Sequence, residues 1–247
     1  MVSCSNLVKR FGRFTAVDDV SFRVERGTIC ALIGANGAGK TTTLGMLTGM
    51  LLPTAGRILV AGASIEDDPV ELRRRTGVVP DSLGLFDALT VEEHLRLSAS
   101  VYGLEREVAR RRCEDLLALL SLDSARRRFA ADCSHGMRKK LALALAVLHN
   151  PAVLFLDEPF EGMDPVAAET VRHALGAAAR RGTTVLFTSH SLNLVERLAD
   201  QVVFIHHGRV ALDRPISDLP KALHELYFET LGQPDHGRME WLGSPQS

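Results

Sequence analysis

An eight-residue segment near the amino terminus restricts the possible folds of this chain more than any other. Residues 34–41 read Gly-Ala-Asn-Gly-Ala-Gly-Lys-Thr, which matches the pattern G-x-x-x-x-G-K-[ST]. The segment follows an apolar run, residues 29–33, and precedes a helical pattern at residues 42–50. A strand, a glycine-rich loop and a helix in this order are typical of a loop that binds phosphate groups. The alternative is a glycine-rich turn that matches by chance, and the flanking strand and helix argue against it.

The residue types of this loop suit a nucleoside triphosphate bound together with Mg²⁺. Glycines let the backbone fold closely enough for successive N–H groups to surround the phosphates, and the helix N-terminus adds partial positive charge. Lys40 would reach the β and γ phosphates, and the Thr41 hydroxyl would ligate Mg²⁺. The candidate nucleotide-binding residues of the loop are Gly34, Asn36, Gly37, Gly39, Lys40, Thr41 and Thr42.

A second apolar run, residues 153–156, ends in two acidic residues, Asp157 and Glu158. Burying two adjacent carboxylates at a strand end is costly unless a cation neutralises them, and a nucleotide-bound Mg²⁺ would do so. We therefore interpret Asp157 as the magnesium carboxylate and Glu158 as the general base or water-orienting group. Alone, an Asp-Glu pair at a strand end is more often a loop start or a helix cap. We interpret the pair as functional because it occurs together with the phosphate loop.

The remaining hydrophobic pattern predicts a doubly wound α/β core. Residues 28–33, 153–156 and 183–187 read as buried parallel strands, and each is followed by a helical pattern. Between about residues 89 and 150 the pattern changes to helix after helix, which we interpret as a helical subdomain inserted in the core. The predicted helices of this stretch are residues 91–102, 107–120 and 137–148.

Composition limits the partners and the compartment. The 247 residues include 29 Lys and Arg and 30 Asp and Glu, a net charge of -1, so no overall positive field would attract nucleic acid. Three triple-arginine runs, at 73–75, 110–112 and 126–128, are interpreted as solvated helix faces, with binding to phosphates or to a partner protein as the alternative.

The spacing of the four cysteines fits neither a metal site nor a disulfide framework, which favours a reducing cytosol. We find no signal peptide and no apolar run near the roughly 20 residues that span a bilayer.

Taken in this order, the motifs resemble those of the ABC ATPase family over about residues 7–214. Ser134 and Gly136 stand directly before the helical run from Met137, at the place of the family's signature sequence Leu-Ser-Gly-Gly-Gln. The resemblance implies a P-loop NTPase (RecA-like) α/β core with an inserted α-helical subdomain and an N-terminal β subdomain. It also implies an ATPase that uses Mg²⁺ with ATP, in which the signature segment of one subunit closes over the ATP held by the other.

The resemblance assigns roles to three further residues. His190 is at the place of the switch histidine, which would donate a hydrogen bond to the γ-phosphate. Asp164 falls in a segment similar to the D-loop, which contacts the opposite subunit, and Phe11 resembles the aromatic residue that stacks on adenine. The alternatives are an ordinary polar histidine, a plain Asp-Pro turn, and core packing for Phe11 or its neighbour Phe14.

Two positions depart from the family pattern. The first glycine of the signature is replaced by His135, whose bulk would approach the partner's phosphates and would slow hydrolysis or tune it with pH. The glutamine that usually follows a strand and a proline is replaced by Asp81 after Pro80. Asp81 would still bind Mg²⁺ or orient water, but it cannot donate a hydrogen bond as an amide does.

The resemblance implies separate transmembrane permease subunits and a second ATPase subunit, identical or different, and no nucleic-acid partner. The chain would be cytoplasmic and peripheral on the inner face of the cell membrane through those subunits. A weaker resemblance to the ABC-2 type suggests export. Two alternatives stay open: a catalytically degenerate nucleotide-binding partner in a heterodimer, which His135 and Asp81 motivate, and a non-transport ABC ATPase.

The chain is expected to divide into a single ABC ATPase domain and a short extension. The domain would span residues 1–215, and the extension would span residues 216–247. Within the extension, residues 220–231 are amphipathic, and residues 232–247 contain glycine and proline and are expected to form a mobile tail.

Overall fold

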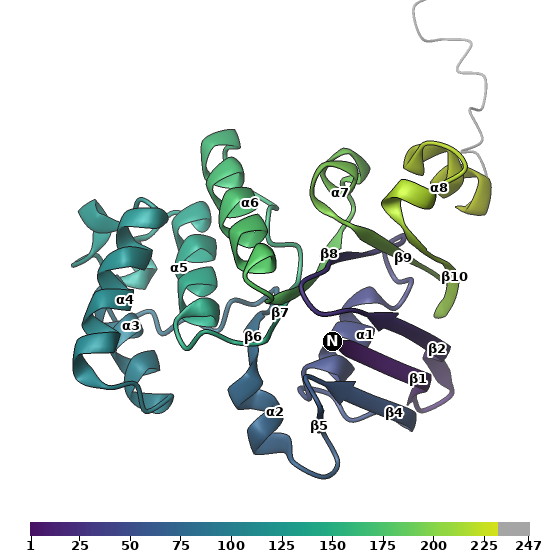
Figure 1. Ribbon diagram of the computed structural model, residues 1–247, viewed down its shortest axis with the longest axis horizontal. Helices are drawn as coiled ribbons and strands as arrows, with labels where there is room; N and C mark the ends of the chain where they lie inside the picture. The colour runs from purple at the N-terminus through teal and green to yellow at the C-terminus, as the bar shows by residue number, and fades with distance from the viewer. Residues whose placement is uncertain (232–247) are drawn as a thin grey trace, which may run out of the picture.

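A six-stranded, mostly parallel sheet forms the centre of the computed structural model, which describes residues 1–231 (Figure 1). The tail that we expected to be mobile, residues 232–247, lies outside the described residues. The strand order is β10-β9-β3-β8-β7-β6, and only the pair of β10 and β9 is antiparallel. The strands are β3 (Ile29–Ile33), β6 (Thr76–Val79), β7 (Val153–Leu156), β8 (Thr184–Ser189), β9 (Gln201–His206) and β10 (Arg209–Pro215).

Every residue of β3, β7 and β8 is buried, because both faces of the central sheet are covered. Alternate residues point into two separate cores. Leu32 and Phe155 pack in one core with side chains of α1 (Lys40–Leu47) and of the second sheet. Ile33 and Leu156 pack in the other core with side chains of α5, α6 and α7. Two-sided burial is the physical reason for the continuously apolar strands in the sequence.

The second sheet is antiparallel and has the order β2-β1-β4-β5. Its strands are β1 (Val2–Phe11), β2 (Phe14–Val24), β4 (Ala55–Val60) and β5 (Ala63–Ser64). Buried and more exposed residues are interspersed along β1 and β2, as in a sheet that packs on one face only. The predicted fold class, an α/β core with a β-rich amino-terminal part and a helical insertion, is confirmed.

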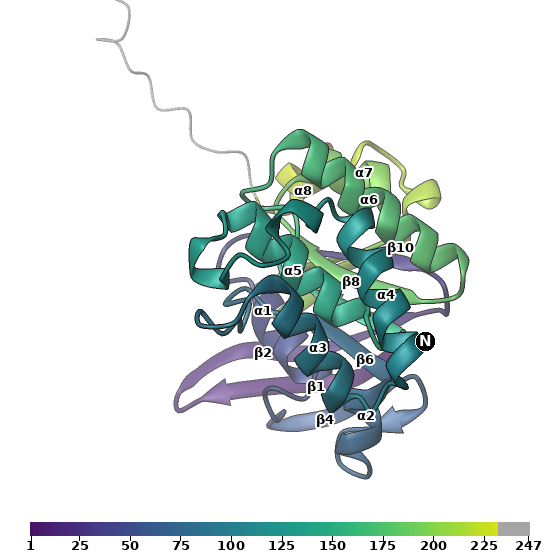
Figure 2. The ribbon, with the colours of Figure 1, turned by 90° about the vertical axis from the view of Figure 1, so that its left-hand side faces the viewer.

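Three helices between the two halves of the core gather at one end of the molecule (Figures 1 and 2). They are α3 (Val91–Val101), α4 (Arg106–Leu119) and α5 (His135–Val147), and residues 89–150 contain only an isolated bridge, Thr90 with Phe129, and no strand. The other helices are α2 (Pro69–Arg75), α6 (Pro165–Arg180), α7 (Leu192–Leu198) and α8 (Leu223–Leu231). The boundaries of the proposed domains stay a prediction.

Two helices begin earlier than the sequence pattern predicted. Helix α5 starts at His135 rather than at Met137, because the Ser134 side chain caps it by accepting a hydrogen bond from the Met137 N–H. Helix α1 starts at Lys40 rather than at residue 42, and it ends by Thr48 because Gly49 takes a left-handed conformation, with φ of 72°.

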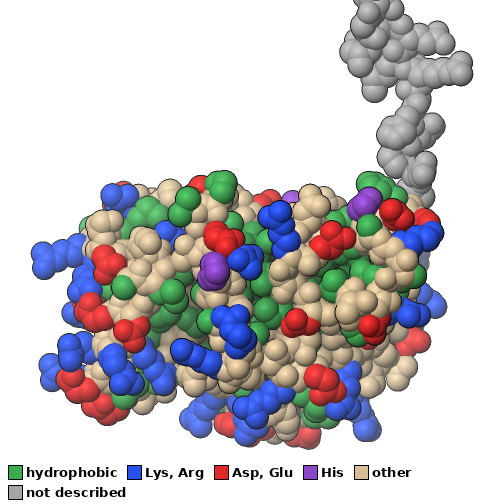
Figure 3. Space-filling view, turned by 45° about the horizontal axis from the view of Figure 1, so that its top comes forward, with side chains coloured by type: hydrophobic (Ala, Val, Ile, Leu, Met, Phe, Trp, Pro, Cys, Tyr) green, Lys and Arg blue, Asp and Glu red, His purple; other side chains and the backbone are tan. Residues whose placement is uncertain are grey.

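Charged side chains of both signs are interspersed on the surface drawn in Figure 3. Each of the three arginine runs contains an ion pair with a nearby glutamate: Arg75 with Glu71, Arg110 with Glu107, and Arg126 with Glu114. The pairs support the interpretation as solvated helix faces for the runs in α2 and α4, whereas residues 126–128 lie in a turn outside any helix. Among the described residues, no helix is both long and apolar enough to cross a membrane.

Helix α8 packs against the core next to α7. Leu223 is buried, and its N–H donates to the Glu196 carboxylate of α7 at 2.9 Å. The Tyr227 ring stacks on Phe204 of β9, with 5.1 Å between the ring centroids. The amphipathic pattern at residues 220–231 therefore belongs to a packed helix that begins at Leu223.

We expect Gly77→Ala to lower the free energy of unfolding by about 1–3 kcal/mol, measured by urea denaturation. A Cβ atom at Gly77 would meet the Ala146 carbonyl oxygen of α5 and the Leu154 side chain, so strand and helix would have to move apart. Gly176→Ala in α6 is the matched control, because its Cβ would meet only the flexible Arg180 side chain. The control should be neutral or stabilising by about 0.5–1 kcal/mol, as in other helix interiors. Equal effects of the two substitutions would contradict the close contact at Gly77.

Candidate functional site

The candidate site lies where three neighbouring parallel strands end. The phosphate loop follows β3, Asp157 follows β7, and His190 follows β8. They surround an open cavity of about 780 Å³. Its lining residues are Phe14, Ala16, Gly34, Ala35, Asn36, Gly37, Gly39, Lys40, Thr41, Thr42, Asp81, Asp157, Glu158, Glu161, His190 and Tyr227. The structure therefore brings the loop, both acids, Asp81 and His190 together.

The backbone of the phosphate loop depends on glycine. Gly39 has φ of 107°, and a Cβ there would lie 2.7 Å from the Ala16 carbonyl oxygen, so another residue would be both strained and crowded. The Lys40 ammonium folds back over the loop and donates to the carbonyl oxygens of Gly34 and Ala35, at 2.8 and 3.1 Å. Burial lowers the pKa of Lys40, while Glu158 and Asp157 act to raise it. The loop thus holds a partly desolvated cation at the place where phosphate oxygens would enter.

Asp157 is 5% exposed and is fixed by two hydroxyl groups. The Thr188 hydroxyl donates to Oδ1 at 2.6 Å, and the Thr41 hydroxyl donates to the same oxygen at 3.4 Å. None of the ion pairs within residues 1–231 includes Asp157. A buried carboxylate of this kind is expected to be balanced by a cation that binds beside it.

The arrangement fits Mg²⁺ that arrives with phosphate groups. Carboxylate and hydroxyl oxygens are the ligands that Mg²⁺ prefers, and such sites often supply only one or two protein oxygens beside substrate phosphates. No cluster of three or more His, Cys, Asp or Glu side chains that would hold a metal ion alone occurs in the described part of the chain. Thr41 and Asp157 are adjacent as expected. Asp81 lines the same cavity, and its role as a ligand stays a prediction.

Glu158 has an unusual backbone conformation. Its φ is 44°, which is rare for a residue with a side chain, and it precedes Pro159, whose ring narrows the choice further. The Glu158 N–H donates to the Thr188 hydroxyl at 2.8 Å. The carboxylate oxygen Oε2 lies 3.1 Å from Nδ1 of His190. The two predicted catalytic residues therefore contact each other, with the other ring nitrogen of His190 left for a further partner.

The signature and D-loop residues lie outside this cavity. Ser134 caps α5, and Asp164 caps α6 by accepting hydrogen bonds from the N–H groups of Val166 and Ala167, both at 3.0 Å. These backbone hydrogen bonds lower the pKa of Asp164. His135 is the first residue of α5 and Gly136 the second.

The cavity includes Phe14 but not Phe11. The two aromatic residues are partners in the hairpin of β1 and β2, both are exposed, and Lys9 lies over the Phe11 ring. Because both rings are exposed, the alternative of core packing holds for neither of them. The stacking of Phe11 on adenine stays a prediction.

Sequence reasoning missed Thr188, Glu161, Tyr227 and Lys139. Lys139 is buried and donates from Nζ to the Glu158 carbonyl oxygen at 2.6 Å. A signal for it was present, because Lys139 begins a row of buried helix positions that continues with Ala142, Leu143 and Ala146. Thr188 and Tyr227 carried no comparable signal, because their contacts depend on how strands and helices pack.

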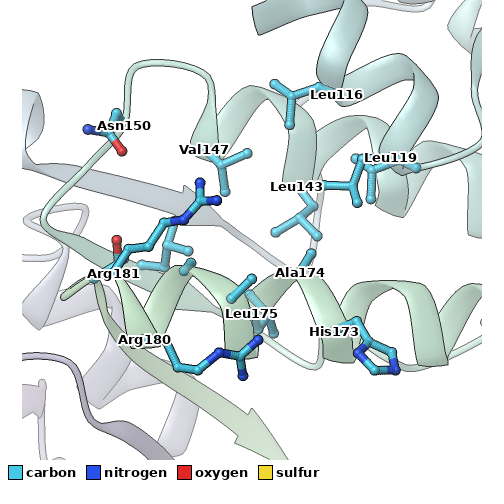
Figure 4. A pocket seen from close by; sticks show the side chains of 15 residues that line it. Leu116, Leu119, Leu143, Val147, Asn150, His173, Ala174, Leu175, Arg180 and Arg181 are labelled. Atoms are coloured by element: carbon cyan, nitrogen blue, oxygen red, sulfur yellow. The ribbon is translucent and has the colours of Figure 1, made fainter.

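A second cavity, of about 510 Å³, lies between α4, α5 and α6 (Figure 4). Leu116, Leu119 and Leu143 line it, and Arg180 and Arg181 project from the end of α6. It contains none of the predicted site residues, so we assign the nucleotide to the first cavity.

Comparison with known proteins agrees with this site. Residues 17–161 match the family model described as ABC transporter. The chain is 34% identical to the ABC-type transporter ATP-binding protein EcsA of Bacillus subtilis, over 93% of this chain and 96% of that protein. It is 37% identical to Nod factor export ATP-binding protein I of Ralstonia nicotianae, over 94% and 70%. A solved ATP-binding subunit of an ABC transporter superposes with a TM-score of 0.89 at 34% identity, over 94% of this chain and 99% of that one.

We expect Lys40→Ala to weaken binding of Mg-ATP by roughly 10- to 100-fold or more, measured with a fluorescent nucleotide analogue. The substitution removes the charge-assisted hydrogen bonds from the buried ammonium to phosphate oxygens. Lys221→Ala is the control, because Lys221 pairs with Glu229 in α8 and does not line the cavity. Unchanged affinity in Lys40→Ala would remove the phosphate loop from nucleotide binding.

Proposed function

The chain belongs to the ABC transporter family and is an ATP-binding, ATP-hydrolysing subunit. On this premise we propose that it works as a dimer. The dimer would drive export through separate transmembrane subunits. ATP would bind at the phosphate loop of one chain and be covered by Ser134, His135 and Gly136 of the other. Dimer closure on ATP and reopening after hydrolysis would move the membrane subunits. Binding to those subunits would hold the chain at the inner face of the membrane. Asp164 would contact the opposite chain next to this interface.

The observation that carries the proposal is the incompleteness of the site within one chain. Lys40, Asp157 and Glu158 line the nucleotide cavity, whereas the segment from Ser134 to Gly136 does not. This segment lies at the start of α5, where the helix dipole and the N–H groups of a first turn favour an anion. An anion site that is exposed and lies away from its own chain's nucleotide is suited to the nucleotide of a second chain.

Export and membrane coupling rest on the relatives. Nod factor export ATP-binding protein I and the bacitracin transport ATP-binding protein BcrA of Bacillus licheniformis, which is 33% identical over 90% of this chain and 72% of that protein, are named for transport. A dimeric ATP-binding cassette bound to ADP and Pi has the same fold, with a TM-score of 0.80 at 23% identity. Both relatives are named as ATP-binding proteins, and we propose that the pathway itself belongs to separate subunits.

The proposed chemistry assigns one task to each group at the strand ends. Mg²⁺ held by Thr41 and Asp157 would neutralise charge on the β and γ phosphates. Glu158 would orient the attacking water and take its proton. His190, which contacts Glu158 through Nδ1, would hold the carboxylate and donate to the γ-phosphate through its other nitrogen. Lys40 would compensate the phosphate charge.

We expect the specific ATPase activity of the purified chain to rise with protein concentration, because each site borrows residues from a second chain. Glu158→Gln should bind Mg-ATP normally, lower kcat by roughly 100- to 10,000-fold, and accumulate as a closed dimer that light scattering detects. Full turnover in a strictly monomeric sample would contradict the dimer. Binding without turnover at every concentration would instead indicate an obligatory partner, either a membrane subunit or a different cassette.

We expect His135→Gly to raise kcat a few-fold, because in the proposed dimer the imidazole would stand where the partner's phosphates approach. In this chain the ring packs over Gly162, where an added Cβ would lie 2.7 Å from Cδ2 of His135. His135→Ala separates the loss of bulk from the helix flexibility that glycine adds. Unchanged or lower rates in both variants would show that the histidine is accommodated or used.

A further inference from the structure

Lys139 is a buried cation to which the proposed chemistry gives no task. Its side chain is 2% exposed and belongs to α5, the helix that begins at the signature residues. Nζ donates to the Glu158 carbonyl oxygen at 2.6 Å and lies 4.0 Å from the Glu161 carboxylate. Lys139 does not line the nucleotide cavity. It therefore touches the main chain of Glu158 without lining the substrate space.

Burial of this ammonium group is costly, and the acidic residues around it lower the cost. Desolvation lowers the pKa of Lys139, whereas the charges of Glu161, Asp81, Glu158 and Asp157 act to raise it. An uncharged donor would make one hydrogen bond to a carbonyl oxygen at a smaller desolvation cost. The ammonium group of Lys139 makes a stronger hydrogen bond to the carbonyl oxygen than such a neutral donor would, at the larger desolvation cost.

The main chain of Glu158 is held at its N–H and at its C=O, which belong to the two successive peptide groups that flank Cα. Thr188 accepts from its N–H at 2.8 Å, and Lys139 donates to its C=O at 2.6 Å. A positive φ before a proline is unfavourable for glutamate and persists only where neighbouring groups fix it. The direction of the Glu158 side chain follows from this backbone conformation, since Cα and Cβ turn with the peptide.

We propose that Lys139 is a positioning residue that fixes the carbonyl end of the Glu158 main chain and thereby couples the signature helix of a chain to that chain's own water-activating carboxylate. The proposal rests on the proposed function, in which Glu158 activates water and Ser134 contacts ATP in the second subunit. Lys139 lies five positions after Ser134, the N-cap of the same helix. A shift of α5 on engaging the partner's ATP would move the Lys139 ammonium and reset Glu158. Closure of one ATP site would thus change the position of Glu158 in the other site.

The test uses the full chain and three substitutions in α5. Lys139→Met keeps the length of the side chain and removes both charge and donor, and Lys139→Arg keeps charge and donor. Lys140→Met is the matched control, because it removes the same charge from the adjacent residue, which is only partly buried. ATPase kinetics, melting temperature and the imidazole NMR signals of His190 are measured for each. His190 is one of nine histidines, and a His190→Gln variant assigns its signals.

We expect Lys139→Met to lower kcat by about 10- to 100-fold, the usual effect of misplacing a reacting group by about 1 Å. KM should change by less than about threefold, because Lys139 does not line the cavity. The His190 signals should move without nucleotide, since Nδ1 contacts Glu158. Lys139→Arg should recover most of the activity, and Lys140→Met should resemble the parent. In a Glu158→Gln background, Lys139→Met should add no further loss.

Parental kcat and unmoved His190 signals in Lys139→Met would overturn the proposal. So would a full additional loss in the Glu158→Gln background, because Lys139 would then act elsewhere. If Lys139→Met is unfolded, Lys139→Gln, which keeps a donor but no charge, takes its place: lower kcat with moved His190 signals supports the proposal, and parental kcat with unmoved signals overturns it. If the parent chain does not turn over alone, the homodimer fails while the nucleotide-free His190 signals still decide the role of Lys139.

Discussion

The register of three parallel strands is the constraint on which the rest of this structure depends. Leu156 of β7 is paired with Phe187 of β8, so Asp157 stands beside Thr188, and Leu32 of β3 is paired with Thr188 in turn. This pairing is what allows the Thr188 hydroxyl to reach both Asp157 and the Glu158 N–H. A slip by one residue would turn every side chain of β8 to the opposite face and separate these groups.

The same register explains why the sheet tolerates polar residues in its centre. Thr188 is fully buried, but its hydroxyl accepts one hydrogen bond and donates another, so it carries no unsatisfied polar atom. Asp157 is buried beside it, with Lys40 and Lys139 as the nearby buried cations. The site is thus a small polar region that borders both apolar cores and faces the open cavity, and its buried groups interact more strongly than charges at the surface.

Much of this arrangement could be predicted from the sequence, and the failures have physical causes. The phosphate loop, the acids after β7 and the three helices of residues 89–150 each have a local pattern, and they were found at or near their positions. The helix starts at His135 and Lys40 were missed because capping by Ser134 and the turn at Gly39 outweigh the apolar periodicity. Lys139 and Thr188 matter through long-range contacts, which single-segment patterns do not contain. The replacement of the usual signature glycine makes His135 conspicuous in the sequence, whereas the buried lysine four residues later is the one that contacts Glu158.

The capping hydrogen bonds of Ser134 and Asp164 have a consequence for how related chains should be judged. Both side chains stabilise the first turn of a helix within their own chain, by roughly 1 kcal/mol each. A descendant that had lost ATP turnover would still gain folding stability from them, so selection for a folded chain alone would retain both. Their presence is therefore a poor criterion for separating working enzymes from inactive paralogues. The strained Glu158 has no such reason to persist, and its loss would be the earlier sign of decay.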